Sequence, residues 1–473
     1  MSHVCYAAVG NLVHGLLLLR LAQRAAPSFG GLAPASCAHI GRKSTWGWYV
    51  AKAFLSLLLV VAMSVGMQGI ALADPWPDDS PNPSGPAVGI PNILPTLAFQ
   101  LGEVGTTALG VSDTELAGVG LSGIDPADSA TSSSGSLLTV DDDLAQCPHA
   151  QYTSIQAAVS AAAPGDQIKV CAGTYSEQVL ITTDGLTLFS EVPLAAVIQA
   201  PPTIAADVVS FKSIVRVSGA QNVTIRHFTI TGPGPGICDS IRYGVRVDSG
   251  GSATIAHNNI TKIHDTPFSG CQTGHAVNIG RFADGQVGSG IVRQNLIDEY
   301  QKGGVLVEGL GSRGDVRENE VRGVGPTPVI AQNGIVVNRH AHADIHHNRV
   351  SGNRYTGGGF VATGILPVRV DQADEIAIHH NETFSNDVGI APFFADAIDV
   401  AHNRSHDNTE SGIHAFPPSP TQANTIEYND SFNNAVDCKD DTVGTGTAGT
   451  ANLWIKDKGN TENRMGICKK TGP

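Results

Sequence analysis

The sequence predicts an all-β fold, a right-handed parallel β-helix with three short strands per turn and a short N-terminal capping helix. The main support is a repeat of an apolar residue, two polar residues, Asn, one polar residue and usually a β-branched residue, as in 345–350. Its Asn recurs at Asn258, Asn295, Asn319, Asn348, Asn381, Asn403 and Asn429. The differences between these numbers, 37, 24, 29, 33, 22 and 26, indicate a fixed unit with loops of varying length.

Two further short strands accompany each Asn strand. A Gly-(Ile/Val)-x-x segment precedes it, as at Gly304 and Gly334, and a short segment such as the one ending at Val350 follows it. Three short strands per turn, with residues alternating inward and outward, cannot close as a sandwich of long strands. They fit the stacked turns of a parallel β-helix.

Composition agrees with a solenoid and excludes one class of partner. The 473 residues include 54 Gly and only 5% aromatic residues, which is poor material for one large core. A solenoid relaxes that requirement, because each turn buries itself against its neighbours. The net charge of −14 argues against a nucleic-acid partner. It also disfavours polyanions, unless basic residues cluster locally or a cation intervenes.

The N-terminal region predicts export. Residues 1–73 contain five Lys and Arg but no Asp or Glu, and an apolar run ends at Ala71-Leu72-Ala73. This pattern is typical of a signal peptide, here cleaved after Ala73. A transmembrane anchor is the alternative, and a start assigned too far upstream would explain the long segment before Arg42. Residues 74–143, rich in Pro, Gly, Ser and Asp, are expected to form a flexible linker with at most short strands. The β-helix domain is expected to span 144–473.

Six cysteines remain after removal of the leader, which suggests three disulfides in an exported chain. Contacts in a solenoid are local, so the sequential pairing is expected: Cys147–Cys171, Cys238–Cys271 and Cys438–Cys468.

A single amphipathic segment, 154–162, opens the array and is followed by Pro164-Gly165. We expect it to form a helix that covers the open β edge. This opening stretch, through Gly173-Thr174-Tyr175-Ser176-Glu177, is similar to the opening motif of pectinesterases. From about Cys147 onward the chain resembles the pectin-lyase-like β-helix superfamily. The catalytic motifs of pectinesterases and polygalacturonases are missing, so the resemblance implies the fold and leaves the activity open.

Equivalent residues in successive turns of a β-helix lie about 4.8 Å apart. The seven Asn are therefore expected to form a hydrogen-bonded ladder at a corner where Asn takes the left-handed conformation. His347, His380 and His402, directly before three of them, would form a second column. Three imidazoles could hold a metal, but a column spaces ligands along a line, so a stacked outer ladder is the alternative.

The resemblance implies a substrate groove along the Gly-(Ile/Val) strands. The outward residues expected there are Arg246, Asn278, Leu306, Val336, Leu366, Ala391, His414 and Asp437. The middle of this row is apolar. At its end His414 and Asp437 would stack as base and orienting carboxylate, next to Phe393 and Phe416, which could pack on a sugar face. The candidate substrate-binding residues are Arg246, Asn278, Phe393, Phe416, Arg354 and Tyr355.

A second acidic pair completes the candidate site. Asp374 and Asp396 fall at one register in adjacent turns, where they could hold calcium or share a proton. No cofactor is expected to be required, and calcium is an option.

Three functions compete: a carbohydrate-active enzyme (lyase, hydrolase or uronate epimerase), a non-catalytic glycan-binding or surface β-helix, and a metal-handling periplasmic β-helix. The sequence favours a secreted, monomeric protein that interacts with polysaccharide, with no nucleic-acid partner and no membrane contact after signal cleavage.

Overall fold

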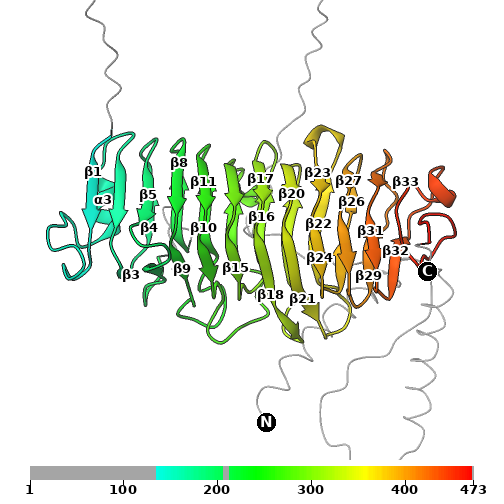
Figure 1. The fold of residues 1–473 in the computed structure, drawn as a ribbon, viewed down its shortest axis with the longest axis horizontal. Coiled ribbons are helices and arrows are strands. Elements are labelled where there is room, and N and C mark those ends of the chain that lie inside the picture. The colour runs from blue at the N-terminus through cyan, green and yellow to red at the C-terminus, as the bar shows by residue number, and fades with distance from the viewer. Residues whose placement is uncertain (1–134, 206–211, 471–473) are drawn as a thin grey trace, which may run out of the picture. The chain divides into compact units, whose positions relative to one another are not determined.

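The computed structural model describes residues 135–205 and 212–470. Three parallel sheets wind through this part of the chain, and each turn contributes one strand to each sheet. Figure 1 shows successive turns side by side, from β1 and the helix α3 (Ile155–Ala161) at one end to β33 at the other. The predicted all-β parallel β-helix is confirmed. No helix among the described residues is long and apolar enough to cross a membrane.

Sheet 1 has twelve strands and contains the residues that lead into each Asn of the repeat. Its strands, in order, are β1 (Leu137–Val140), β2 (Gln167–Val170), β5 (Thr187–Ser190), β8 (Val223–Arg226), β11 (Ser252–Ala256), β14 (Ser289–Arg293), β17 (Arg313–Arg317), β20 (His342–His346), β23 (Ala377–His379), β27 (Asp399–Ala401), β30 (Thr425–Glu427) and β33 (Leu453–Ile455).

Sheet 2 has eleven strands and contains the Gly-(Ile/Val) segments. Its strands are β4 (Val179–Ile181), β7 (Ser213–Ser218), β10 (Tyr243–Asp248), β13 (His275–Ile279), β16 (Gly303–Glu308), β19 (Asn333–Asn338), β22 (Thr363–Val370), β25 (Val388–Ile390), β29 (Ser411–Ala415) and β32 (Val436–Asp440), with β26 (Phe393–Ala395) paired to β22.

Sheet 3 has ten strands, which follow the Asn residues. They are β3 (Gly173–Ser176), β6 (Ala196–Gln199), β9 (Thr229–Thr231), β12 (Asn259–Thr261), β15 (Leu296–Asp298), β18 (Glu320–Thr327), β21 (Arg349–Tyr355), β24 (Glu382–Phe384), β28 (Arg404–His406) and β31 (Asp430–Phe432). Three single-turn 3₁₀ helices, η1 (Phe282–Asp284), η2 (Gln372–Asp374) and η3 (Thr447–Gly449), interrupt the connections of the described chain.

The core consists of aliphatic residues stacked between turns, because the inward positions of each strand pair directly with those of the next. In sheet 1 one such column runs through Ile225, Ile255, Val292, Val316, Ile345, Ile378, Val400 and Ile426 to Trp454. Trp454 is 5% exposed and the other eight side chains have no solvent exposure. The large Trp side chain closes the column at its C-terminal end.

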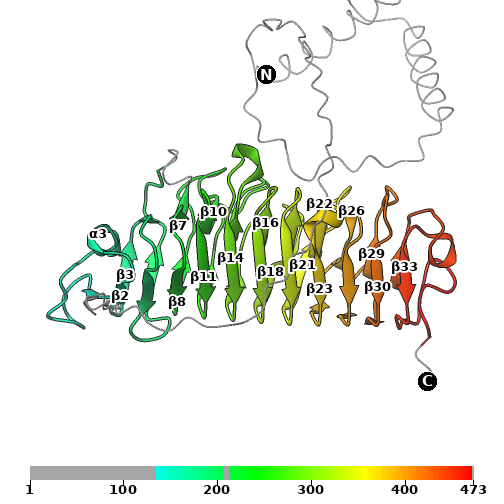
Figure 2. The same cartoon turned by 90° about the horizontal axis from the view of Figure 1, so that it is seen from above.

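The helix α3 covers the N-terminal end of the array, as expected (Figure 2). Ser154 caps it by accepting a hydrogen bond from the Ala157 amide, and the Glu177 carboxylate accepts from the Ile155 and Gln156 amides at 2.8 Å each. The paired strands begin earlier than the expected boundary at 144. β1 lies inside the segment expected to be a linker, and it pairs with β2 along its whole length.

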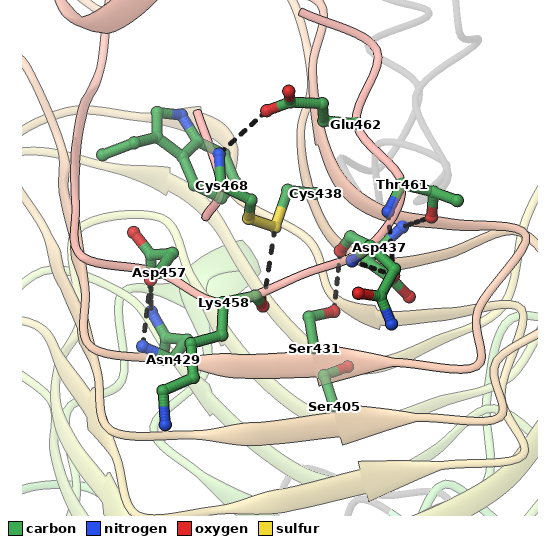
Figure 3. The surroundings of a disulfide bond; sticks show 12 residues. Ser405, Asn429, Ser431, Asp437, Cys438, Asp457, Lys458, Thr461, Glu462 and Cys468 are labelled. Carbon is green, nitrogen blue, oxygen red and sulfur yellow. Dashed lines mark hydrogen bonds between the residues drawn. A yellow bond between two sulfur atoms is a disulfide. The ribbon is translucent and has the colours of Figure 1, made fainter. Parts of the chain in front are cut away.

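The three disulfides are those predicted. Cys147–Cys171, Cys238–Cys271 and Cys438–Cys468 have Cα–Cα distances of 6.3, 5.8 and 6.3 Å. The last one fastens the final described segment to β32 (Figure 3).

The predicted Asn ladder is present and fully buried. From Asn258 onward each Asn side-chain amide donates to the Oδ1 atom of the next Asn, at 3.0 to 3.1 Å. The prediction that Asn occupies the left-handed corner is wrong. The residue before each Asn does so, with φ of 56° at His257, 57° at His347 and 53° at Tyr428. This corner turns the Asn side chain into the interior, where its amide needs partners, and points the preceding side chain at solvent.

Two more ladders were not predicted. One runs through Asn353, Asn386, Asn408 and Asn434, and the other joins Asn424 to Asn452. All three ladders end at a buried carboxylate: Asn429 donates to Asp457, Asn434 to Asp437 and Asn452 to Asp440.

Candidate functional site

The predicted row of outward residues on sheet 2 exists. Arg246 pairs with Asn278, then Leu306, Val336 and Leu366 follow in register. The prediction that Asp437 ends this row is wrong, because His414 pairs with Lys439 and not with Asp437. The buried, disulfide-bonded Cys438 fills the inward position opposite Ile413, so the next residue, Lys439, is the outward one.

Asp437 is therefore structural. Its Oδ1 atom accepts hydrogen bonds from the Asn434 amide and side chain, and its Oδ2 atom accepts from the Asn460 and Thr461 amides at 2.8 and 3.1 Å. Figure 3 shows it beside Thr461, below the disulfide. With four donors around a 2% exposed side chain, neither oxygen is left to orient His414.

The partner of His414 is Asp441, one turn further on. Its Oδ2 atom lies 2.9 Å from His414 Nε2 and 3.5 Å from Lys439 Nζ. Burial lowers the pKa of His414, and the hydrogen bond to His414 lowers the pKa of the Asp441 carboxyl. The imidazole is therefore neutral at pH 7, with Asp441 charged. We name His414, Phe416, Lys439 and Asp441 the His414 cluster.

Aromatic side chains flank the His414 cluster. The Phe416 ring stacks on His414 with centroids 3.5 Å apart, and it meets the Phe393 ring edge to face at 6.1 Å. The predicted neighbourhood of Phe393 and Phe416 is therefore confirmed, in an edge-to-face arrangement. Phe394 contacts Phe393 and is 47% exposed, so this end of sheet 2 presents an aromatic surface to solvent.

The middle of the row is an apolar layer outside the β-helix core. Leu306, Val336, Leu366 and Ala391 form a buried cluster with Val368 and Val388, against which Val361, Phe393 and Phe416 pack. This agrees with the predicted apolar centre. A polar reaction centre is absent from it, among the residues described.

The N-terminal half of the same face carries the densest set of charged groups. We name Arg216, Arg246, Asp248, Arg281, Asp284 and Glu308 the Arg246 cluster. Asp248 forms ion pairs with Arg216 (2.9 Å) and with Arg246, and Asp284 pairs with Arg281 at 2.9 Å. Asn278 Nδ2 lies 3.4 Å from Glu308 Oε1, and the Arg246 guanidinium lies over the Tyr243 ring at 5.2 Å.

Burial perturbs several groups here. It raises the pKa of Glu308 to about 7, although Arg281 and the Asn278 amide favour the charged form. It lowers the pKa of Lys302 to about 7 and that of His275 to about 3. Perturbed titratable groups concentrate at functional sites. The sequence predicts only Arg246 of this cluster, together with its neighbour Asn278. Tyr243 and His275, paired at the start of the same two strands, are the signal in the sequence that points to the rest.

The predicted site residues thus divide between two places. Six strand steps separate β10 from β29, which puts Arg246 about 29 Å from His414. Arg354 and Tyr355 belong to neither cluster. They end β21, where they pair with Pro326 and Thr327 of β18, and the Tyr355 amide donates to Asp387.

Asp374 and Asp396 are not level with each other. Asp374 sits in η2, an inserted turn that sequence spacing does not reveal, while Asp396 directly follows β26. The Asp396 carboxylate accepts hydrogen bonds from the amide and the hydroxyl of Thr421. Asp374 is buried and lies with Asp371 and His340, whose Nδ1 atom is 3.3 and 3.4 Å from the two carboxylates. The capping box of η2 accounts for both Asp residues.

His347, His380 and His402 form the predicted column. Neighbouring rings are 5.1 and 5.2 Å apart and tilted by 2° and 18°. Parallel rings at this spacing place their nitrogens along a line, as a stacked outer ladder does, and do not surround one metal ion.

No family model matches this sequence, and no curated protein matches it. Similar solved structures include a complex of XylC with xylose, with 13% identity and a TM-score of 0.37 over 69% of this chain and 70% of that one. A mannuronic acid-specific polysaccharide family 6 lyase from human gut microbiota has 13% identity and a TM-score of 0.39 over 69% and 81% of the two chains. A periplasmic alginate epimerase, AlgG, has 14% identity and a TM-score of 0.33 over 62% of this chain and 63% of that one.

The resemblance to pectin-lyase-like β-helix proteins is confirmed in fold, which the three parallel sheets of this chain show directly. Identities and TM-scores this low carry no argument about activity. The chain is a parallel β-helix protein with two polar clusters on the outer face of sheet 2.

Proposed function

We propose that this is an exported protein that interacts with an acidic, uronate-bearing polysaccharide along the outer face of sheet 2. Three disulfides support export, because such bonds persist in oxidising compartments. The predicted signal peptide lies outside the described residues.

The observation that carries the proposal is the Arg246 cluster. The whole chain has a net charge of −14, yet this half of one face gathers Arg216, Arg246 and Arg281. Only Asp248, Asp284 and Glu308 oppose them, and burial keeps Glu308 partly protonated at pH 7. The cluster is therefore close to neutral in an otherwise acidic protein, which removes a barrier to a polyanion, and guanidinium forks match carboxylates in geometry.

The aromatic end of the face supports the same function. Phe394 is exposed, and Phe393 and Phe416 lie beside the His414 cluster. The C–H face of a sugar ring packs on such surfaces. Arg246 and Asn278 themselves have no solvent exposure, so a saccharide reaches them only when the residues packed over this part of the face move apart.

A catalytic version is the second candidate, and one observation favours it. A neutral His414 oriented by a charged Asp441 is the arrangement of a general base and its orienting group. Its Nδ1 atom is buried and has no hydrogen-bond partner in the described structure, so proton transfer through it requires the stacked Phe416 ring to move.

Binding of the mature chain to a polyuronate and to a neutral glucan tests the proposal. The polyuronate is expected to bind at least tenfold more tightly, with an affinity that falls as salt rises. Arg281→Gln is expected to remove most of this preference. The matched control is Arg313→Gln, a 60% exposed Arg on sheet 1.

Equal binding of the two glycans, or a polyuronate affinity unaffected by Arg281→Gln, contradicts the proposed function. Catalysis is tested separately by assaying reducing ends and unsaturated products. If turnover is found, His414→Ala and Asp441→Asn should each abolish it, and turnover that survives both rules out the His414 cluster.

A further inference from the structure

Two pairs of adjacent histidines lie at the corner between sheets 1 and 3. We name His346–His347 and His379–His380 the histidine pairs. In each pair the two Nδ1 atoms face each other, at 2.9 and 3.0 Å, and the rings are nearly perpendicular, at 83° and 87°. His347 and His380 are exposed.

The backbone imposes this arrangement twice. The first histidine ends a strand, β20 or β23, and the second takes the left-handed conformation, with φ of 57° at His347 and 55° at His380. The corner brings the second ring across the end of the first. Parallel pairing then stacks one histidine pair on the other, His346 on His379 at 5.0 Å and His347 on His380 at 5.1 Å.

A carboxylate fixes the proton arrangement of the His379–His380 pair. His379 Nε2 lies 2.9 Å from Asp344 Oδ1, so this nitrogen carries a proton and donates. In a neutral ring Nδ1 is then a bare acceptor, and it can approach His380 Nδ1 only if that atom carries a proton. One proton is thus shared between two nitrogens. In the other pair His346 Nε2 lies 3.6 Å from Asp315 Oδ1, close enough for an ion pair but beyond hydrogen-bond distance.

We propose that each histidine pair is a two-nitrogen site for a borderline transition-metal ion such as Cu²⁺, Ni²⁺ or Zn²⁺. The metal takes the place of the shared proton: the Nδ1–H bond of the outer ring breaks, that ring takes up a proton from solvent on its Nε2 atom, and two metal–nitrogen bonds form. Imidazole nitrogen suits these ions. An imidazole whose other nitrogen donates to a carboxylate is the usual form of a metal-bound histidine, since that bond fixes its tautomer and orientation.

Only the outer ring has to move. The two Nδ1 atoms of a pair face each other across the shared proton, at 2.9 and 3.0 Å. A metal with bonds of about 2.0–2.1 Å needs their lone pairs to converge, which a rotation of the exposed His347 or His380 side chain achieves. The inner rings of His346 and His379 stay against Asp315 and Asp344.

This site differs from the column of His347, His380 and His402. His402 stacks on His380 at 5.2 Å but follows Ala401, so it has no adjacent imidazole. The chain thus offers a matched control, an exposed histidine of the same column and backbone conformation without a partner ring. The inference is also independent of the proposed function, because this corner is not part of sheet 2.

Calorimetric titration of the full chain with Cu²⁺, Ni²⁺ and Zn²⁺ chlorides tests the proposal. Affinity is expected to follow the order Cu²⁺ above Ni²⁺ and Zn²⁺. Repeating the titration above pH 7 in buffers of different ionisation enthalpy should give the same binding enthalpy, because neutral rings change tautomer without net release of a proton. The variant His347→Ala/His380→Ala is expected to bind at least tenfold more weakly, and His402→Ala to bind like the parent. Asp344→Asn should weaken binding at its pair by about 10–100-fold.

Equal losses in His402→Ala and His380→Ala would assign metal binding to the column instead. An unchanged affinity in the double variant would show adventitious surface binding and overturn the proposal. All the replaced side chains are exposed or half-buried, and circular dichroism confirms that each variant is folded.

Discussion

Replacing Asp437 by Asn separates a structural role from a catalytic one. The substitution keeps one oxygen for the Asn434 amide and side chain but puts an NH₂ group where the Asn460 and Thr461 amides now donate. Two part-buried amide donors lose the oxygen of the buried Asp437, at about 1–2.5 kcal/mol each. We expect the C-terminal turns to lose about 2–5 kcal/mol of stability.

The loss should be local, because turns of a solenoid contact only their neighbours. Hydrogen exchange of the β32 amides is the direct measurement, with urea denaturation for the whole array. Asp441→Asn is the matched control: its side chain is 39% exposed, so stability should change by less than about 1 kcal/mol. Unchanged exchange in β32 together with lost glycan turnover in Asp437→Asn would refute the structural assignment and restore Asp437 as the partner of His414.

Three further predictions concern the C-terminal end and the ladder. Burial raises the pKa of Asp457 to about 7, above its unfolded value of about 4. Its protonated form therefore contributes stability that is fully present below pH 4 and is lost as pH rises through 7. The urea midpoint should be lower at pH 8 than at pH 5, and equal midpoints would contradict this. Removing the last disulfide with Cys438→Ser/Cys468→Ser should lower the free energy of unfolding by about 2–4 kcal/mol. Proteolysis after β32 should then be faster in the variant than in the parent, and equal rates would contradict the prediction. Asn381→Ala breaks the ladder on both sides and should cost about 2–4 kcal/mol in urea denaturation, against less than about 0.5 for Glu427→Ala, a half-buried surface residue of sheet 1 two turns away.

The fold was predictable because its causes are periodic. The Asn repeat specifies a turn with buried amides, the Gly-(Ile/Val) strands specify the adjoining sheet, and local contacts specify the disulfides. Each of these depends on residues within one or two turns. The left-handed conformation lies one residue earlier than predicted, at the residue before each Asn. Asn tolerates that conformation, but its side chain is needed inside the ladder, so the preceding residue makes the turn.

The site was only partly predictable, because register depends on insertions. The η2 turn separates Asp374 from the level of Asp396, and the buried Cys438 moves the outward position from Asp437 to Lys439. The Arg246 cluster brings together groups from β7, β10, β16 and the segment around η1, and the raised pKa of Glu308 arises from burial that spacing alone does not reveal.

The carboxylates at the ends of the three Asn ladders also set a limit on growth. Every amide in a ladder both accepts and donates, so another turn can always be added after it. Asp457, Asp437 and Asp440 accept the last hydrogen bonds, and both oxygens of each carboxyl group are occupied by donors from the protein. A duplicated turn can therefore be inserted only upstream of them, and two molecules cannot join end to end by continuing a ladder. The length of the β-helix is fixed because each of its three Asn ladders ends at a carboxyl group that accepts the last hydrogen bond.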